Sequence, residues 1–182
     1  VGTFCVIRKP AVGLRPSSFF GLGLRSRNET PEDFDAAQMM GVKWKRGLDL
    51  QFVFPGKVHP GPDKWWDEAL KQKAIDNAVA WKNAGVSVIG YIDYNMPWNT
   101  PLDEKGKHKP IYRTPPADLN AHADMVEELV RTLKDHVTHW ELWNEPGGFF
   151  WGGTSEQYRE MLKVVYERIK PKYPDVNLIG GG

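Results

Sequence analysis

Short apolar runs alternate along this chain with longer segments in which apolar residues recur at helical spacing. The short runs predict five β-strands, at residues 19–24, 42–47, 86–93, 137–144 and 176–180. The segments between them predict four helices, at about residues 31–40, 63–84, 117–134 and 154–170. This alternation is typical of repeated βα units, which build a parallel sheet.

Local signals support the limits of the predicted helices. Thr30 precedes Pro31, an arrangement that suits an N-cap followed by the first helical position. Gly85 follows the second helix, where a glycine commonly ends a helix. Thr154 and Gln157 have the spacing of a capping box and predict the start of the fourth helix.

The connections that follow the predicted strands are longer than those that precede them. Residues 49–62, 94–116 and 147–153 come after strands, whereas the links from helix to strand are short. Parallel α/β folds build their sites from loops at the carboxyl ends of the strands. The sequence therefore predicts a functional site at one end of the sheet.

Two architectures fit five parallel strands. One is the N-terminal part of a (β/α)8 TIM barrel, which needs eight strands and about 250 residues, more than the 182 residues of this chain. The other is an open five-stranded sheet of the doubly wound kind. We expect the first, with residues 1–17 as an N-terminal extension and residues 18–182 as the first five strands of one catalytic barrel.

Composition narrows the possible partners. The 24 basic and 23 acidic residues give a net charge of +1, so we expect no nucleic acid partner. No apolar run reaches the ~20 residues of a spanning helix, and the first residues lack a signal-peptide pattern, so we expect no membrane partner. The sequence does not identify the cellular compartment of the protein, and it is compatible with secretion or a periplasmic location.

The sequence also lacks the usual signatures of cofactor and metal chemistry. Cys5 is the single cysteine, which excludes an internal disulfide framework. The five histidines have no paired-ligand spacing, so we expect no metal site. Gly21 and Gly23 begin a dinucleotide fingerprint, but its third glycine is missing. We therefore expect no cofactor.

The segment WELWNEP at positions 140–146 combines a strand pattern with an abrupt end. Pro146 stops the strand, which places Glu145 at its carboxyl end. Glycoside hydrolysis needs two carboxyl groups, one of which donates a proton to the leaving oxygen. Trp143, Trp151 and either Phe149 or Phe150 would desolvate Glu145 and raise its pKa, as a proton donor requires. A solvated loop glutamate is the alternative.

This segment resembles the fourth-strand motif of the clan A glycoside hydrolases, which are retaining TIM-barrel enzymes. The segment GVKWKR at positions 41–46 resembles the second strand of that clan, and GYIDY at positions 90–94, with the following Pro97 and Trp98, resembles its third strand and substrate loop. Family 39, which includes β-xylosidases, looks most similar, and families 5 and 51 stay open. The resemblance covers residues 18–182.

The resemblance implies roles for individual residues. Glu145 corresponds to the acid/base, Asn144 to the group that binds the 2-hydroxyl of the sugar, and Arg46 to a support for the catalytic carboxylates. The nucleophile of the clan is a glutamate on the seventh strand, which we expect beyond residue 182.

We therefore expect a retaining hydrolase of β-linked oligo- or polysaccharides. Its partners would be a carbohydrate substrate and the remaining half of the barrel, in the same chain or a complementing one. The alternative is a barrel fragment or pseudoenzyme that binds carbohydrate without cleaving it.

Other polar residues near the strand ends have two interpretations. Glu141 lies on the same strand face as Glu145 but too deep for catalysis, and we predict a structural ion pair with Arg46 or Lys43. Asp49 and Asp93 end strands, where each could bind sugar hydroxyls or cap a turn.

Four aromatic residues complete the predicted substrate-binding set. Their rings could lie against a sugar or pack in the loops. They are Tyr94, Trp98, Trp143 and Trp151.

Overall fold

The protein forms a five-stranded parallel sheet in which consecutive strands are neighbours, in the order β1-β2-β3-β4-β5. This computed structural model describes residues 21–23, 29–49 and 53–181. The strands are β1 (Gly21–Leu22), β2 (Trp44–Arg46), β3 (Ser87–Ile92), β4 (His139–Leu142) and β5 (Asn177–Gly180).

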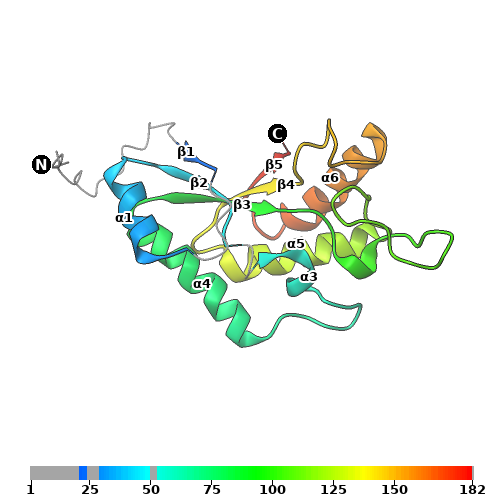
Figure 1. Ribbon diagram of the computed structural model, residues 1–182, viewed down its shortest axis with the longest axis horizontal. Coiled ribbons are helices and arrows are strands. Elements are labelled where there is room, and N and C mark those ends of the chain that lie inside the picture. The colour runs from blue at the N-terminus through cyan, green and yellow to red at the C-terminus, as the bar shows by residue number, and fades with distance from the viewer. Residues whose placement is uncertain (1–20, 24–28, 50–52, 182) are drawn as a thin grey trace, which may run out of the picture.

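The helices of the described chain cover one face of this sheet (Figure 1). They are α1 (Pro31–Met39), the short α3 (Pro55–Val58), α4 (Glu68–Asn83), α5 (Leu119–Leu133) and α6 (Ser155–Ile169), with a 3-10 turn η1 (Pro97–Asn99). A doubly wound sheet reverses its strand order and carries helices on both faces. The architecture is therefore a partial TIM barrel, and the alternative of an open doubly wound sheet is wrong.

All five predicted strands are confirmed within the described residues, although each is shorter than its apolar run. Val42, Val86, Val137 and Val176 begin four of the predicted runs, and each of their backbone N–H groups bonds a carbonyl of the preceding helix or turn. The backbone N–H groups of these valines therefore bond to the ends of the preceding helices or turns and do not pair in the sheet. The predicted first strand also included residues 19, 20 and 24, which lie outside the described residues.

The helix predicted over residues 63–84 begins later than expected, at Glu68. Asp67 is its N-cap, because the Asp67 carboxylate accepts the N–H of Leu70 at 2.7 Å. The residues just before it form a turn, in which the Trp66 N–H bonds the Val58 carbonyl at 2.9 Å. Helix α3 was not predicted, since four residues are too few to show a helical period.

The capping box predicted for the fourth helix is confirmed. Thr154 accepts the N–H of Gln157 at 3.2 Å, and the Gln157 side chain accepts the N–H of Thr154 at 2.8 Å. This fixes the point at which the loop after β4 becomes α6.

The two faces of the sheet differ in chemistry. The face toward the helices is mostly apolar, with Val88, Ile92, Trp140 and Leu142 packed into the main core and the charged Lys45 as an exception. The opposite face, which is the inside of the partial barrel, carries polar and aromatic residues together with two isoleucines. The strand register places them in rows: Trp44, Arg46, Ser87, Ile89, Tyr91, His139, Glu141, Asn177 and Ile179.

Gly90 on β3 makes room for Trp140 on β4, its partner in the strand register. A Cβ atom at Gly90 would lie 2.4 Å from the Trp140 ring, which is only 1% exposed. A side chain on β3 would therefore displace a large buried ring beneath the sheet.

Candidate active site

Arg46 lies at the centre of a polar network inside the partial barrel. Its Nε and Nη2 atoms donate to the two carboxylate oxygens of Glu141 at 2.5 and 2.7 Å. The paired planar groups are a strong, oriented form of ion pair. The hydrogen bond to Glu141 raises the pKa of Arg46. The predicted structural pairing of Glu141 with Arg46 is thus confirmed.

Tyr91 and Asp93 extend this network along β3. The Arg46 guanidinium lies over the Tyr91 ring at 4.0 Å, a favourable cation–π contact. The Tyr91 hydroxyl donates to Asp93 at 2.9 Å. Burial, followed by the nearby Asp93 charge, raises the pKa of Tyr91. Asp93 is buried in this network. From the sequence alone, Asp93 could either cap a turn or bind sugar hydroxyls.

Asn144 connects the network to the end of β4. Its Oδ1 accepts a hydrogen bond from Arg46 Nη2 at 3.1 Å, while its Nδ2 is buried with no partner among the described residues. A buried amide without a partner is uncommon and calls for an explanation. Asn144 therefore holds a buried donor, unpaired within the described part of the chain, immediately before Glu145.

Glu145 lies at the predicted place, just past the end of β4, but its side chain is exposed. The expected enclosure by Trp143, Trp151 and a phenylalanine is not observed, because the two tryptophans pack inward. Within the described residues, the prediction that these rings desolvate Glu145 is therefore wrong. Its backbone carbonyl accepts the N–H of Gly148 at 3.0 Å, which closes a turn directly after the carboxylate.

The backbone is strained where β3 and β4 end. Among the described residues, the non-glycine residues with positive φ are Tyr94 at 72°, Trp143 at 74° and Glu145 at 41°. Side chains disfavour this left-handed region, and such strain concentrates at functional sites. The three residues mark the end of the sheet at which long loops were predicted to build a site.

Trp143 and Trp151 belong to a buried aromatic cluster. They are 1% and 7% exposed, and their rings meet edge to face at 4.9 Å. Each indole N–H donates to a backbone carbonyl, of Phe150 and of Thr154. Packing accounts for both rings, and neither presents the sugar-binding face expected of it.

Tyr94 and Trp98 are partly buried. Tyr94 packs at the edge of Trp143, with 6.0 Å between ring centroids. Trp98 lies in η1 and donates its indole N–H to the carbonyl of His59 at 2.8 Å. The structure thus ties both residues to neighbouring loops, and their contact with substrate stays a prediction.

Asp49 lies in a separate buried cluster, on the helix side of β2. The Asp49 N–H donates to Asn77 at 3.3 Å, and Asn77 in turn donates to Glu29 at 2.8 Å. Glu29 also pairs with Lys45 at 2.7 Å, and both of these side chains are 1% exposed. Burial lowers the pKa of Lys45, an effect that Glu29 opposes. Asp49 thus supports the packing of α4 and is separate from the network of Arg46.

Sequence reasoning missed two exposed rings near Glu145. Tyr112 and Phe149 are 39% and 58% exposed, and they stack with 6.2 Å between centroids. Phe149 was considered only as a cover for Glu145, and nothing in the loop sequence links it to Tyr112. Their pairing comes from the approach of the loops after β3 and β4.

Two kinds of feature are absent from the described residues. No group of three histidine, cysteine, aspartate or glutamate side chains there has an arrangement that could hold a metal ion. None of the helices described here is long and apolar enough to cross a membrane.

Comparisons with known proteins agree with this geometry. One segment is 39% identical over 66 residues to a β-xylosidase of Caldicellulosiruptor saccharolyticus, a match that covers 31% of this chain and 14% of that protein. No family model matches the chain.

Two solved glycosidase structures have a similar fold. A family 39 glycoside hydrolase from Bacteroides cellulosilyticus WH2 matches with a TM-score of 0.64 and 24% identity, over 90% of this chain and 31% of that one. Endo-glycoceramidase II from Rhodococcus sp. matches with a TM-score of 0.65 and 14% identity, over 88% of this chain and 47% of that one. The chain thus spans less than half the length of these relatives. Its fold is that of part of a TIM barrel, similar to the barrels of these glycoside hydrolases.

Proposed function

We propose that this chain supplies the acid/base half of a retaining glycoside hydrolase that acts on β-linked oligo- or polysaccharides. The observation that carries the proposal is the arrangement of Asn144 and Glu145. A buried amide donor without a partner among the described residues lies next to an exposed carboxyl group, at the strained end of a barrel strand. The two residues offer a sugar one hydrogen-bond donor and one proton-transferring group.

In this mechanism Glu145 donates a proton to the glycosidic oxygen as the bond to the anomeric carbon breaks. Later the Glu145 carboxylate removes a proton from the attacking water. Exposure of Glu145 in this half of the barrel is compatible with the role of acid/base, because the substrate and the remaining barrel wall would surround this residue.

Asn144 would bind the 2-hydroxyl of the sugar through Nδ2. Its Oδ1 is held by Arg46, so the amide is oriented with Nδ2 as the group left for a ligand. A hydrogen bond of this kind strengthens as positive charge develops at the anomeric carbon, so it accelerates the reaction as well as supporting binding.

Glu141 does not act as the second carboxylate in this proposal. Both of its oxygens are bound by Arg46, and the residue is 6% exposed. The nucleophile is expected from a segment beyond residue 182, about 5 Å from the Glu145 carboxyl group, as retaining chemistry requires.

Replacement of Glu145 in the full-length protein tests the proposal. We expect Glu145→Gln to lower turnover of β-linked oligosaccharides by about 10²–10⁴-fold, the usual contribution of general acid–base catalysis. The loss should be smaller for nitrophenyl β-glycosides, because a phenolate leaves without a proton. Glu160→Gln, at an exposed position on α6, is the matched control.

Unchanged hydrolysis in Glu145→Gln would exclude the assigned role. A wild-type protein that binds β-linked oligosaccharides without cleaving them would replace the proposal with a non-catalytic carbohydrate-binding barrel.

A further inference from the structure

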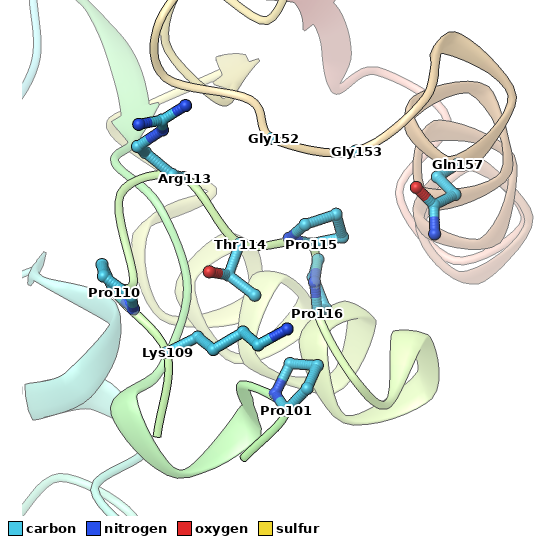
Figure 2. Close-up of a pocket in the computed structure, with 10 residues that line it drawn as sticks. All are labelled: Pro101, Lys109, Pro110, Arg113, Thr114, Pro115, Pro116, Gly152, Gly153 and Gln157. Carbon is cyan, nitrogen blue, oxygen red and sulfur yellow. The ribbon is translucent and has the colours of Figure 1, made fainter. Parts of the chain in front are cut away.

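A cavity of about 460 Å³ lies between the loops that follow β3 and β4. Its walls combine prolines, glycines and a few polar side chains, and none of the described lining residues is acidic. The lining residues are Pro101, Lys109, Pro110, Arg113, Thr114, Pro115, Pro116, Gly152, Gly153 and Gln157. Figure 2 shows Lys109 and Pro101 across the cavity from Gly152 and Gly153, with Gln157 on α6 at one end.

The close approach of the two loops depends on the paired glycines. The Gly152 N–H donates to the Arg113 carbonyl at 2.6 Å, and a Cβ atom at Gly152 would lie 2.7 Å from that oxygen. A Cβ atom at Gly153 would lie 2.5 Å from the Pro115 ring. The two loops therefore pack closely against each other, and this packing forms the cavity between them.

Two cationic groups border the cavity with no anionic partner among the described residues. Lys109 directs its ammonium group toward Pro116, whereas the Arg113 guanidinium points away from the other lining side chains (Figure 2). The guanidinium lies over the exposed Phe149 ring at 4.4 Å. Stacking uses the face of the group and leaves its N–H donors free at the edge, where they match a carboxylate.

This cationic rim is continuous with the turn that carries Glu145. Phe149 lies one residue beyond that turn, and it stacks on Tyr112, the neighbour of Arg113. Exposed aromatic rings bind the apolar faces of sugar rings, and a guanidinium or ammonium group beside them selects an acidic sugar. The combination differs from the neutral, amide-based recognition at Asn144.

We propose that this cavity and its Arg113–Phe149 rim form an accessory subsite for a uronic acid branch on a β-linked oligosaccharide. Arg113 binds the carboxylate of the branch, the Tyr112–Phe149 pair contacts its ring, and Lys109 adds positive charge from the adjacent cavity. This inference rests on the proposed function and deepens it, since it names an acid-substituted polysaccharide as the substrate class.

Direct binding to the full-length protein tests the subsite separately from catalysis. Isothermal titration would compare a β-linked xylo-oligosaccharide that carries one glucuronic acid branch with the undecorated backbone and with the methyl ester of the branch. We expect the acidic form to bind about twofold to fivefold more tightly than the other two at low salt, the range for exposed ion pairs. Arg113→Gln should remove most of that difference and Lys109→Gln a smaller part, and the double variant should remove it all.

Lys105→Gln is the matched control, because Lys105 is an exposed lysine of the same loop that does not line the cavity. It should leave the preference intact. Equal affinity for the acidic and undecorated forms, equal affinity for the acid and its ester, or an unchanged preference in the double variant would each overturn the inference. Hydrolysis of the undecorated oligosaccharide by the wild-type protein is measured alongside, so a failure of the proposed catalysis is seen separately from a failure of the subsite.

Discussion

Arg46 on β2 and Glu141 on β4 are joined by two hydrogen bonds, of 2.5 and 2.7 Å, that reach across the intervening strand β3. The Tyr91 ring of β3 lies beneath the guanidinium at 4.0 Å. This one ion pair therefore ties three strands together at the level of the candidate active site. A change to either charged partner should act on the sheet as well as on the site.

Loss of the Glu141 charge should destabilise the barrel. Glu141→Gln leaves the Arg46 guanidinium without its anion in a largely buried position, and breaking a buried pair costs ~3–5 kcal/mol. Because the Arg46 side chain is 32% exposed, we expect a smaller decrease in the free energy of unfolding, about 2 kcal/mol. Urea unfolding of the full-length protein measures it.

An exposed ion pair supplies the comparison for Glu141. Glu156 pairs with Arg159 where both side chains are 72% exposed, so Glu156→Gln should change the free energy of unfolding by less than about 0.5 kcal/mol. Equal effects at the two positions would show that the Arg46–Glu141 pair adds no particular stability.

Truncation of Asn144 should affect turnover more than substrate binding. Asn144→Ala removes the donor proposed for the 2-hydroxyl, and a lost hydrogen bond of this type costs ~1.5–3 kcal/mol, or about 10- to 100-fold in kcat. Steady-state kinetics of the full-length enzyme would separate kcat from KM. Asn83→Ala, at the exposed end of α4, is the control. A rise in KM with kcat unchanged would assign Asn144 to binding alone.

A methyl group at Gly90 should disturb the core beneath the sheet. The Trp140 ring fills the space in which the new Cβ atom would lie, so Gly90→Ala should lower the free energy of unfolding by about 1–3 kcal/mol. Gly23→Ala should have little effect, because an added Cβ atom there would meet none of the described residues within 4 Å. Combining Gly90→Ala with Trp140→Leu should cost less than the sum of the two single changes, which a thermodynamic cycle would measure.

His122 on α5 should make the protein sensitive to mild acid. Complete burial lowers the pKa of His122 from 6.5 to about 4. Between these values the unfolded chain binds a proton that the folded protein excludes, so the stability falls as the pH falls from 6.5 toward 4. The full loss would be about 3 kcal/mol, of which about 2 kcal/mol appears by pH 5.

Urea unfolding at pH 7 and pH 5 tests the role of His122. His122→Leu removes the titrating group, and its stability should fall less between the two pH values than that of the wild-type protein. An equal fall in both proteins would contradict the assignment to His122.

The sequence predicted the five strands and the four longer helices because each of them has its own apolar period. It also predicted that Glu141 pairs with Arg46 or Lys43, since alternation along two strands places Glu141 and Arg46 on the inner face, and the structure selects Arg46. The position of Glu145 at the end of β4 followed from Pro146, which stops the strand. These features depend on spacing within one segment or on the parity of a strand.

Other features depend on contacts that no single segment contains. The exposure of Glu145 depends on where the neighbouring tryptophans pack. The sequence of an aromatic run does not show which of its rings are buried. Lys45 sits in a strand of alternating charged and apolar residues, but its buried partner Glu29 lies in the turn before α1. The Tyr112–Phe149 pair joins two loops whose separate sequences carry no sign of each other.

The strand order has a consequence for how the protein forms during synthesis. Each strand pairs with the one made just before it, so every new βα unit finds its neighbour already present on the emerging chain. Contacts between units that are close in sequence form with a smaller loss of chain entropy than distant ones. The sheet can thus grow one strand at a time from its N-terminal end, and the Arg46–Glu141 pair becomes available only once β4 has joined.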